Sequence, residues 1–158
     1  MGTFEVVVRR HDGSPVVLEN GPLFESGRPM PTRYWLADRA LNRWIGRLES
    51  EKGVKRAEAD VDPVALAATH AAYEHARTEL LPEGHTGPAP SGGVGGTRTG
   101  VKCLHAHYAN HLAGAHDVVG EWVEARLVEV GAAFDPSEPG IASKWDEMTD
   151  VENSDVAQ

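Results

Sequence analysis

The clearest strand-like sequence in this chain lies before residue 37, and most of the later periodic segments have the spacing of helices. The run 4–10 is rich in β-branched residues, 11–15 has turn residues, and 16–18 is again strand-like, which together predict a hairpin. A third strand is expected over 32–36. The predicted fold class is therefore α+β, a small three-stranded antiparallel N-terminal sheet packed by about four helices.

Three of the expected helices begin at an aspartate that can act as N-cap. Asp38 precedes the clearest amphipathic segment, whose apolar residues recur at the spacing of one helix face: Leu41, Trp44, Ile45 and Leu48. The pair Asp62-Pro63 predicts a helix to about Leu81. Asp117 predicts a last helix to about Val130. Between the first two, residues 54–61 are expected to form a short strand or an extended link.

The fourth expected helix follows a glycine-rich loop and contains much of the chemistry of the chain. Residues 82–100 read as a loop. Thr99 is the expected N-cap, Val101 to Ala113 the helix, and Gly114 its end. Side chains from three of these helices are expected to be buried together: Leu41, Trp44, Ile45, Leu48, Leu104, Tyr108, Leu112, Trp122 and Leu127.

The only cysteine and several histidines lie on this helix, which makes it a candidate metal site. Cys103, His107 and His111 follow one another at intervals of four residues, so neighbouring members share one face. One helix can supply two of these as ligands to one zinc ion, so others must come from elsewhere. His105 is a further candidate ligand on another face. The alternative is a solvated or packed histidine-rich helix with a small buried thiol.

The glycine loop also suggests an anion site. Its end nearly matches the phosphate loop GxxxxGK[ST], but the lysine is one position late and a cysteine replaces the Ser or Thr. We therefore reject a nucleotide loop and keep a weaker expectation. Free N–H groups at a helix start favour anions, and we expect a small anionic ligand there. The candidate anion-binding residues are Arg98, Thr99, Gly100, Lys102 and Arg33. A flexible loop with solvated cations is the alternative.

Two classes of function fit these features. If the site is catalytic, Cys103 is the candidate nucleophile and His107 its candidate base, because a thiol nucleophile needs a base within hydrogen-bond reach. The other class is a non-enzymatic adapter that binds a protein partner through its surface and an acidic tail. Residues 135–158 hold seven acids and one lysine, a charge of −6, and their one bulky residue is Trp145. Whether the protein is an enzyme is left open by the sequence.

Composition and length limit the remaining choices. At 158 residues, the chain is expected to form one α+β domain over 1–134, followed by a disordered acidic tail over 135–158. The net charge of −9 argues against a nucleic-acid binder. No stretch has the length of a membrane helix, and the N-terminus lacks a signal-peptide core. One cysteine fits a reducing compartment, so a cytoplasmic protein is expected.

Three segments resemble a known family. Pro29-Met-Pro-Thr-Arg-Tyr-Trp-Leu36, Arg47-Leu-Glu49 and Val101-Lys-Cys-Leu-His105 are similar to bacterial domain-of-unknown-function family 501. The similarity spans roughly residues 5 to 130, and the Lys-Cys-Leu-His signature is its most specific part. Pro15, Gly100 and Gly120 also fit the family pattern.

The resemblance implies no activity, because the family has none established. Its members are often encoded near cell-division septum proteins and an exopolyphosphatase-like enzyme. Many relatives carry extra cysteines in the first hairpin and after the third strand. The chain has Arg10-His11-Asp12 and Ala37-Asp38-Arg39 at these places. If the relatives hold a metal there, this chain has lost the ligands or uses His11 instead.

Overall fold

One antiparallel sheet forms the N-terminal part of the fold, as expected. The computed structural model describes residues 2–140 of the chain. Strands β1 (Gly2–Arg9), β2 (Pro15–Phe24) and β3 (Tyr34–Leu36) lie in the order β1-β2-β3. Leu18 of the central strand pairs with Val6 on one side and with Trp35 on the other. The predicted hairpin, third strand and α+β class are confirmed.

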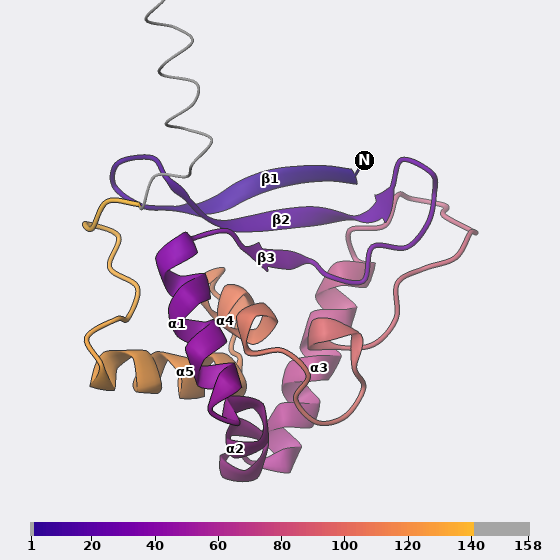
Figure 1. Ribbon diagram of the computed structural model, residues 1–158. Helices are drawn as coiled ribbons and strands as arrows, with labels where there is room; N and C mark the ends of the chain where they lie inside the picture. The colour runs from indigo at the N-terminus through magenta and orange to yellow at the C-terminus, as the bar shows by residue number, and fades with distance from the viewer. Residues whose placement is uncertain (1, 141–158) are drawn as a thin grey trace, which may run out of the picture.

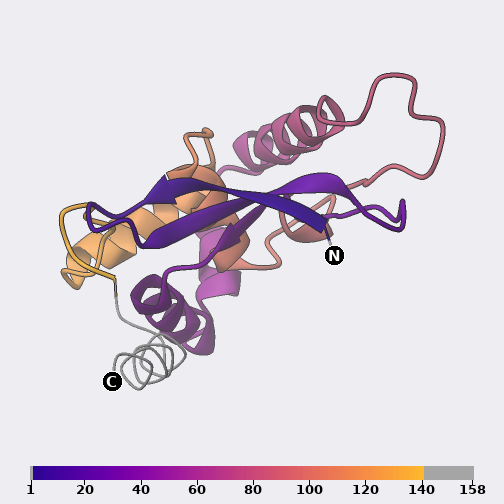
Figure 2. The same ribbon diagram turned by 90° about the horizontal axis from the view of Figure 1, so that it is seen from above.

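The rest of the described chain is helical. The helices are α1 (Arg39–Ser50), α2 (Gly53–Asp60), α3 (Pro63–Thr78), α4 (Leu104–Leu112) and α5 (Val118–Glu129), with a 3-10 turn η1 (Val94–Gly96). All of them lie on the same side of the sheet, and the loop after α3 extends beyond them (Figures 1 and 2). Among residues 2–140, no helix has the length and apolar character needed to cross a membrane.

The helix α2 corrects the expectation of a strand or an extended link over 54–61. Lys52 adopts a left-handed backbone (φ 64°), so the chain turns after α1 and immediately begins another helix. At Gly53, a Cβ would lie 2.4 Å from the carbonyl oxygen of Leu48, so only glycine fits this turn. Ala57, one helical turn later, is fully buried. Gly53 and Ala57, the two small buried residues of α2, allow this segment to pack as a helix. No local capping pattern indicated this helix.

The core lies between the inner face of the sheet and the helices. Six of the nine side chains expected in it are buried: Leu41, Ile45, Leu104, Tyr108, Trp122 and Leu127. Trp44, Leu48 and Leu112 are partly buried and pack against it. The predicted helix faces are therefore correct, although these three side chains lie at the margin.

The three predicted aspartate caps are also confirmed. Asp38 accepts a hydrogen bond from the N–H of Leu41, and Asp62 accepts one from the N–H of Ala65. Asp117 accepts hydrogen bonds from the N–H groups of Val119 and Gly120 in the first turn of α5. Each cap satisfies donors that the helix itself leaves free.

The start of α4 was predicted wrongly. Thr99 is not its cap; the helix begins at Leu104, and Cys103 is the N-cap residue with an extended backbone. Side chains from distant helices explain the delay, because the N–H of Val101 donates to Glu58 and the N–H of Leu104 donates to Glu49, each over 2.8 Å. These contacts hold residues 101–103 outside the helix.

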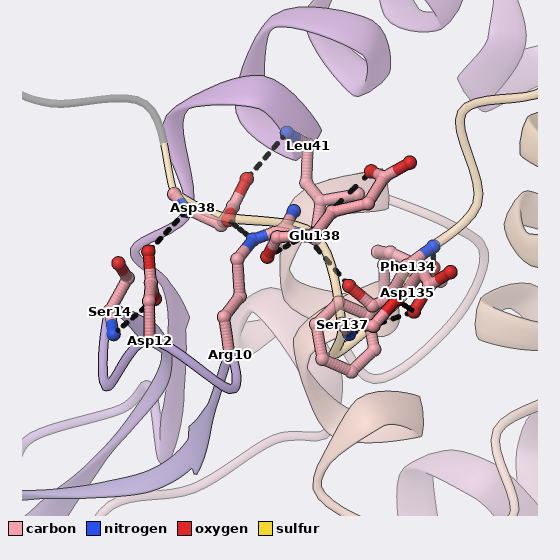
Figure 3. Close-up of polar contacts among 11 residues, drawn as sticks. Arg10, Asp12, Ser14, Asp38, Leu41, Phe134, Asp135, Ser137 and Glu138 are labelled. Carbon is pink, nitrogen blue, oxygen red and sulfur yellow. Dashed lines mark hydrogen bonds and ion pairs between the residues drawn. The ribbon is translucent and has the colours of Figure 1, made fainter.

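Residues 135–140, at the start of the segment expected to be a tail, lie against the turn between β1 and β2. The N–H of His11 donates to the carbonyl oxygen of Pro136 over 2.6 Å. The guanidinium of Arg10 donates to the carbonyl oxygen of Asp135 over 2.9 Å (Figure 3). The rest of the expected tail, with Trp145, lies outside the described residues.

Candidate functional site

Three potential ligand side chains converge where the end of α1 meets the start of α4. Glu49, Cys103 and His105 each offer one atom, and these atoms all lie within 4.8 Å of one another. The Sγ of Cys103 is 3.9 Å from Nδ1 of His105, and that nitrogen is 3.2 Å from Oε1 of Glu49. Among residues 2–140, no other group of three or more such side chains meets the same criterion.

The local structure explains why the cysteine and the histidine face the same way. Cys103 is the N-cap residue of α4, but its side chain does not cap the helix. His105 lies in the first helical turn, two residues later, and both side chains are partly buried. The change from the extended backbone of Cys103 to the helix that begins at Leu104 accompanies the 3.9 Å separation between Sγ of Cys103 and Nδ1 of His105.

Glu49 joins this pair from the last turn of α1. Its Oε1 accepts a hydrogen bond from the N–H of Leu104, so the carboxylate caps α4 from another helix. A negative charge at a helix N-terminus is favourable, and this interaction fixes the oxygen beside His105. Glu49 is therefore held in place by a structural hydrogen bond that does not depend on a metal ion.

The ring of His105 is oriented by its second nitrogen. Nε2 lies 3.2 Å from the carbonyl oxygen of Asn42, so it carries a proton and donates it there. The pKa of His105 is raised to about 9, chiefly by contact with the Cys103 sulfur, and also by the Asn42 carbonyl and the Glu49 carboxylate, whereas partial burial acts to lower it. Without a metal ion, the imidazole is therefore protonated at neutral pH and donates from Nδ1 as well.

The arrangement suits a metal ion better than a catalytic relay. In a relay, the two ring nitrogens of the histidine contact the nucleophile and the carboxylate separately, whereas here Nδ1 alone faces both Cys103 and Glu49. Zinc bonds of about 2.0–2.3 Å at tetrahedral angles would separate such S and N atoms by roughly 3.5 Å and the N and O atoms by roughly 3.3 Å. The observed separations are 3.9 and 3.2 Å.

His107, a predicted ligand and base, lies elsewhere. It is fully buried, and its Nδ1 is 2.9 Å from both carboxylate oxygens of Asp117. Burial would raise the pKa of Asp117, but hydrogen bonds from His107, Asn110 and Gly120 lower it below its usual value. The Nε2 atom of His107 has no hydrogen-bond partner among the described residues. This pair connects α4 to the cap of α5.

The other histidines near this helix have structural contacts. The ring of His111, the remaining predicted ligand, stacks on Tyr108 at a centroid distance of 6.0 Å. His70 of α3 is buried, accepts from the N–H of Val94, and has Nε2 2.8 Å from the carbonyl oxygen of Gly100. His70 therefore donates from Nε2 and fixes the glycine loop against α3 at Val94 and Gly100.

The predicted anion-binding residues are not brought together. Arg98 and Thr99 are exposed on the loop, and Gly100 is bound by His70. Arg33 forms an ion pair with Glu19 over 2.9 Å. Of the five predicted residues, only Lys102 borders the cleft of about 330 Å³ that Cys103 and His105 also line.

The sequence indicated Cys103 and His105 but not their partner. Glu49 was not a candidate site residue, and it lies more than fifty residues before Cys103. No local spacing links residues so far apart, and the same is true of the Asn42 carbonyl. Their roles follow only from the packing of α1 against the start of α4.

Comparison with known proteins is consistent with the Lys-Cys-Leu-His resemblance. Searches of curated proteins and of solved structures found no match. A family model described as "Protein of unknown function (DUF501)" matches residues 6–125, which include Glu49, Cys103 and His105. Because this match covers most of the 158 residues, the chain belongs to the DUF501 family.

Proposed function

We propose that this protein binds one divalent transition-metal ion, with zinc as the best fit, through Glu49, Cys103 and His105. The observation that carries the proposal is the convergence of three ligand atoms within 4.8 Å. A carboxylate, a thiolate and an imidazole are all ligand types found in zinc proteins. Of the candidate ligands predicted from the sequence, the proposed site keeps Cys103 and His105. It adds Glu49 in place of His107 and His111.

The surroundings of the three side chains support this assignment. A metal-binding histidine almost always donates its second ring N–H to a carbonyl or a carboxylate, and His105 does so to Asn42. Glu49 is already held by the N–H of Leu104. Because these contacts fix the positions of Glu49 and His105, little reorganisation is needed when an ion binds.

The same pair offers a second candidate function, a reactive thiol. The Sγ of Cys103 lies 3.9 Å from Nδ1 of His105, so a candidate nucleophile and a candidate base are in contact. Here His105, rather than the predicted His107, would be the base. The two functions differ in one respect: zinc binding would protect the thiol against alkylation.

Zinc titration of untagged, chelator-treated protein tests the proposal. We expect one zinc ion per chain, with an affinity that falls more than about tenfold in Cys103→Ser, His105→Asn and Glu49→Gln. The last variant is informative because a glutamine oxygen can still accept from the N–H of Leu104, so the cap of α4 is retained while the charge is lost. His111→Asn, a predicted ligand outside the cluster, and exposed His75→Asn are the controls.

Two results would contradict the proposal. One is the absence of stoichiometric zinc in the titrated wild-type protein. The other is a loss of affinity in His111→Asn that is equal to the loss in Glu49→Gln. If the thiol is alkylated rapidly in the metal-free protein and zinc gives no protection, the reactive-thiol function is favoured instead.

A further inference from the structure

A cleft of about 330 Å³ opens between β3 and the start of α4, beside the metal cluster. It is lined by Thr32, Tyr34, Trp35, Leu36, Gly95, Lys102, Cys103, His105 and Ala106. Two of the three proposed ligand residues, Cys103 and His105, are thus part of its wall. Its volume is within the range of small-molecule sites, roughly 300–1,000 Å³.

The proposed coordination sphere is incomplete. Within residues 2–140 the cluster contains three protein ligands and no fourth Cys, His, Asp or Glu. Structural zinc sites are closed by four protein ligands, whereas sites with three keep one position for water or an exogenous ligand. Because Cys103 and His105 border the cleft, the remaining position is reached from it.

The charges at the site specify what this ligand should be. A divalent ion is neutralised by the Glu49 carboxylate and the Cys103 thiolate, and a metal-bound His105 is neutral. Lys102 then adds one positive charge on the cleft wall, and it has no ion pair among the described residues. The nearby Glu58 does not line the cleft and is bound to the N–H of Val101. The remaining positive charge favours an anionic ligand.

The other walls specify the body of the ligand. Trp35 of β3 is 48% exposed and borders the cleft with Leu36 and Ala106. A site with one charged corner and apolar walls favours a molecule that has an anionic head and an apolar body.

We infer that the cleft binds a small oxyanion carrying an apolar group, with the oxyanion at the open metal position beside Lys102 and the apolar group against Trp35. This inference rests on the proposed metal site. It extends that proposal from a metal ion to a metal-dependent small-molecule site. A carboxylate and a phosphate ester share the required head, and the experiment below separates them.

Cobalt-substituted protein provides the test, because the ligand-field absorption of Co²⁺ changes when a fourth ligand is exchanged. Acetate, benzoate, inorganic phosphate and phenyl phosphate serve as probes. We expect saturable spectral changes, with benzoate or phenyl phosphate binding at least about tenfold more tightly than its small counterpart. The pair that binds more tightly identifies the head group.

Two variants and one control make the test specific. Lys102→Ala should lower the affinity for both probes with the preferred head group by at least about tenfold. Lys55→Ala, at an exposed position on α2, should leave these affinities unchanged. Trp35→Ala should remove most of the preference for the aromatic member and leave acetate or phosphate nearly unaffected. Lys102 and Trp35 are not proposed metal ligands, so cobalt loading should be unchanged in Lys102→Ala and in Trp35→Ala.

The outcomes separate this inference from the proposed function. If cobalt binds at one ion per chain but none of the four probes changes its spectrum, the cleft inference is wrong and the metal site remains. The inference also fails if Lys102→Ala and Lys55→Ala bind the probes equally. If no cobalt binds at all, both the metal site and the inference are wrong.

Discussion

The Nε of Arg10 donates to Oδ2 of Asp38 over 2.6 Å, and the two side chains are 4% and 2% exposed. Asp38 also caps α1 through the N–H of Leu41. Arg10 extends the contact to the carbonyl oxygen of Asp135 and lies over the ring of Phe134, 5.4 Å from its centroid (Figure 3). This ion pair therefore joins the end of β1, the start of α1 and the segment after α5.

Removing one member of this pair should be costly, because it leaves the other charge buried without a partner. We expect Arg10→Met to lower the free energy of unfolding by about 3–5 kcal/mol. The double variant Arg10→Met/Asp38→Asn should lose less than the sum of the two single variants, as measured by urea denaturation. Glu129→Ala, which breaks the more exposed pair with Arg126, should cost less than about 1 kcal/mol. Equal effects at the two pairs would contradict this account.

Two helical glycines should respond in opposite ways to alanine. At Gly120 a Cβ would lie 2.4 Å from Cβ of His111 and 2.7 Å from the carbonyl oxygen of His107, so α4 and α5 would have to separate. At Gly46 of α1 nothing lies within 4 Å. We expect Gly120→Ala to lower the melting temperature strongly and Gly46→Ala to stabilise by about 0.5–1 kcal/mol. A Gly120→Ala protein as stable as the wild type would show that the two helices are farther apart.

The charge of Asp117 should stabilise the fold at neutral pH. Its pKa is lowered in the folded state from a reference of 3.8, so its contribution is complete above that value and is lost as pH falls through the folded pKa. Asp117→Asn can retain the cap of α5 while removing the charge opposite His107. We expect a cost of about 1.5–3 kcal/mol at pH 7. In urea denaturation at a series of pH values, the difference from wild type should narrow below pH 4; a constant difference would exclude a role for the charge.

Zinc affinity should depend on pH because the ion must displace the Nδ1 proton of His105. Contact with Cys103, Asn42 and Glu49 raises the pKa of this residue to about 9. Below that pH, each unit of acidification should reduce the affinity about tenfold through this proton alone. Competition with a chelator of known proton affinity from pH 6 to 9 measures the slope. An affinity independent of pH over this range would mean that His105 is not a ligand.

Some of the fold was determined by short stretches of sequence. Asp38, Asp62 and Asp117 cap the helices that follow them, as predicted, because the capping side chain and the N–H groups it binds are two or three residues apart. The hairpin of β1 and β2 was predicted for a similar reason, since its turn residues and its strands are adjacent in the chain. Such interactions need no information about the rest of the molecule.

The beginning of α4 and the residues of the candidate site depended instead on tertiary structure. Thr99 and the residues after it formed an acceptable helix start by local criteria, yet Glu58 and Glu49 bind the backbone there and move the start to Leu104. The same Glu49 contact completes the cluster with Cys103 and His105. The sequence by itself determined which residue types were available for this site. Only the packing of α1 and α2 against the 100–105 segment decided which of them meet, because hydrogen bonds between residues more than forty positions apart form only after the helices have packed.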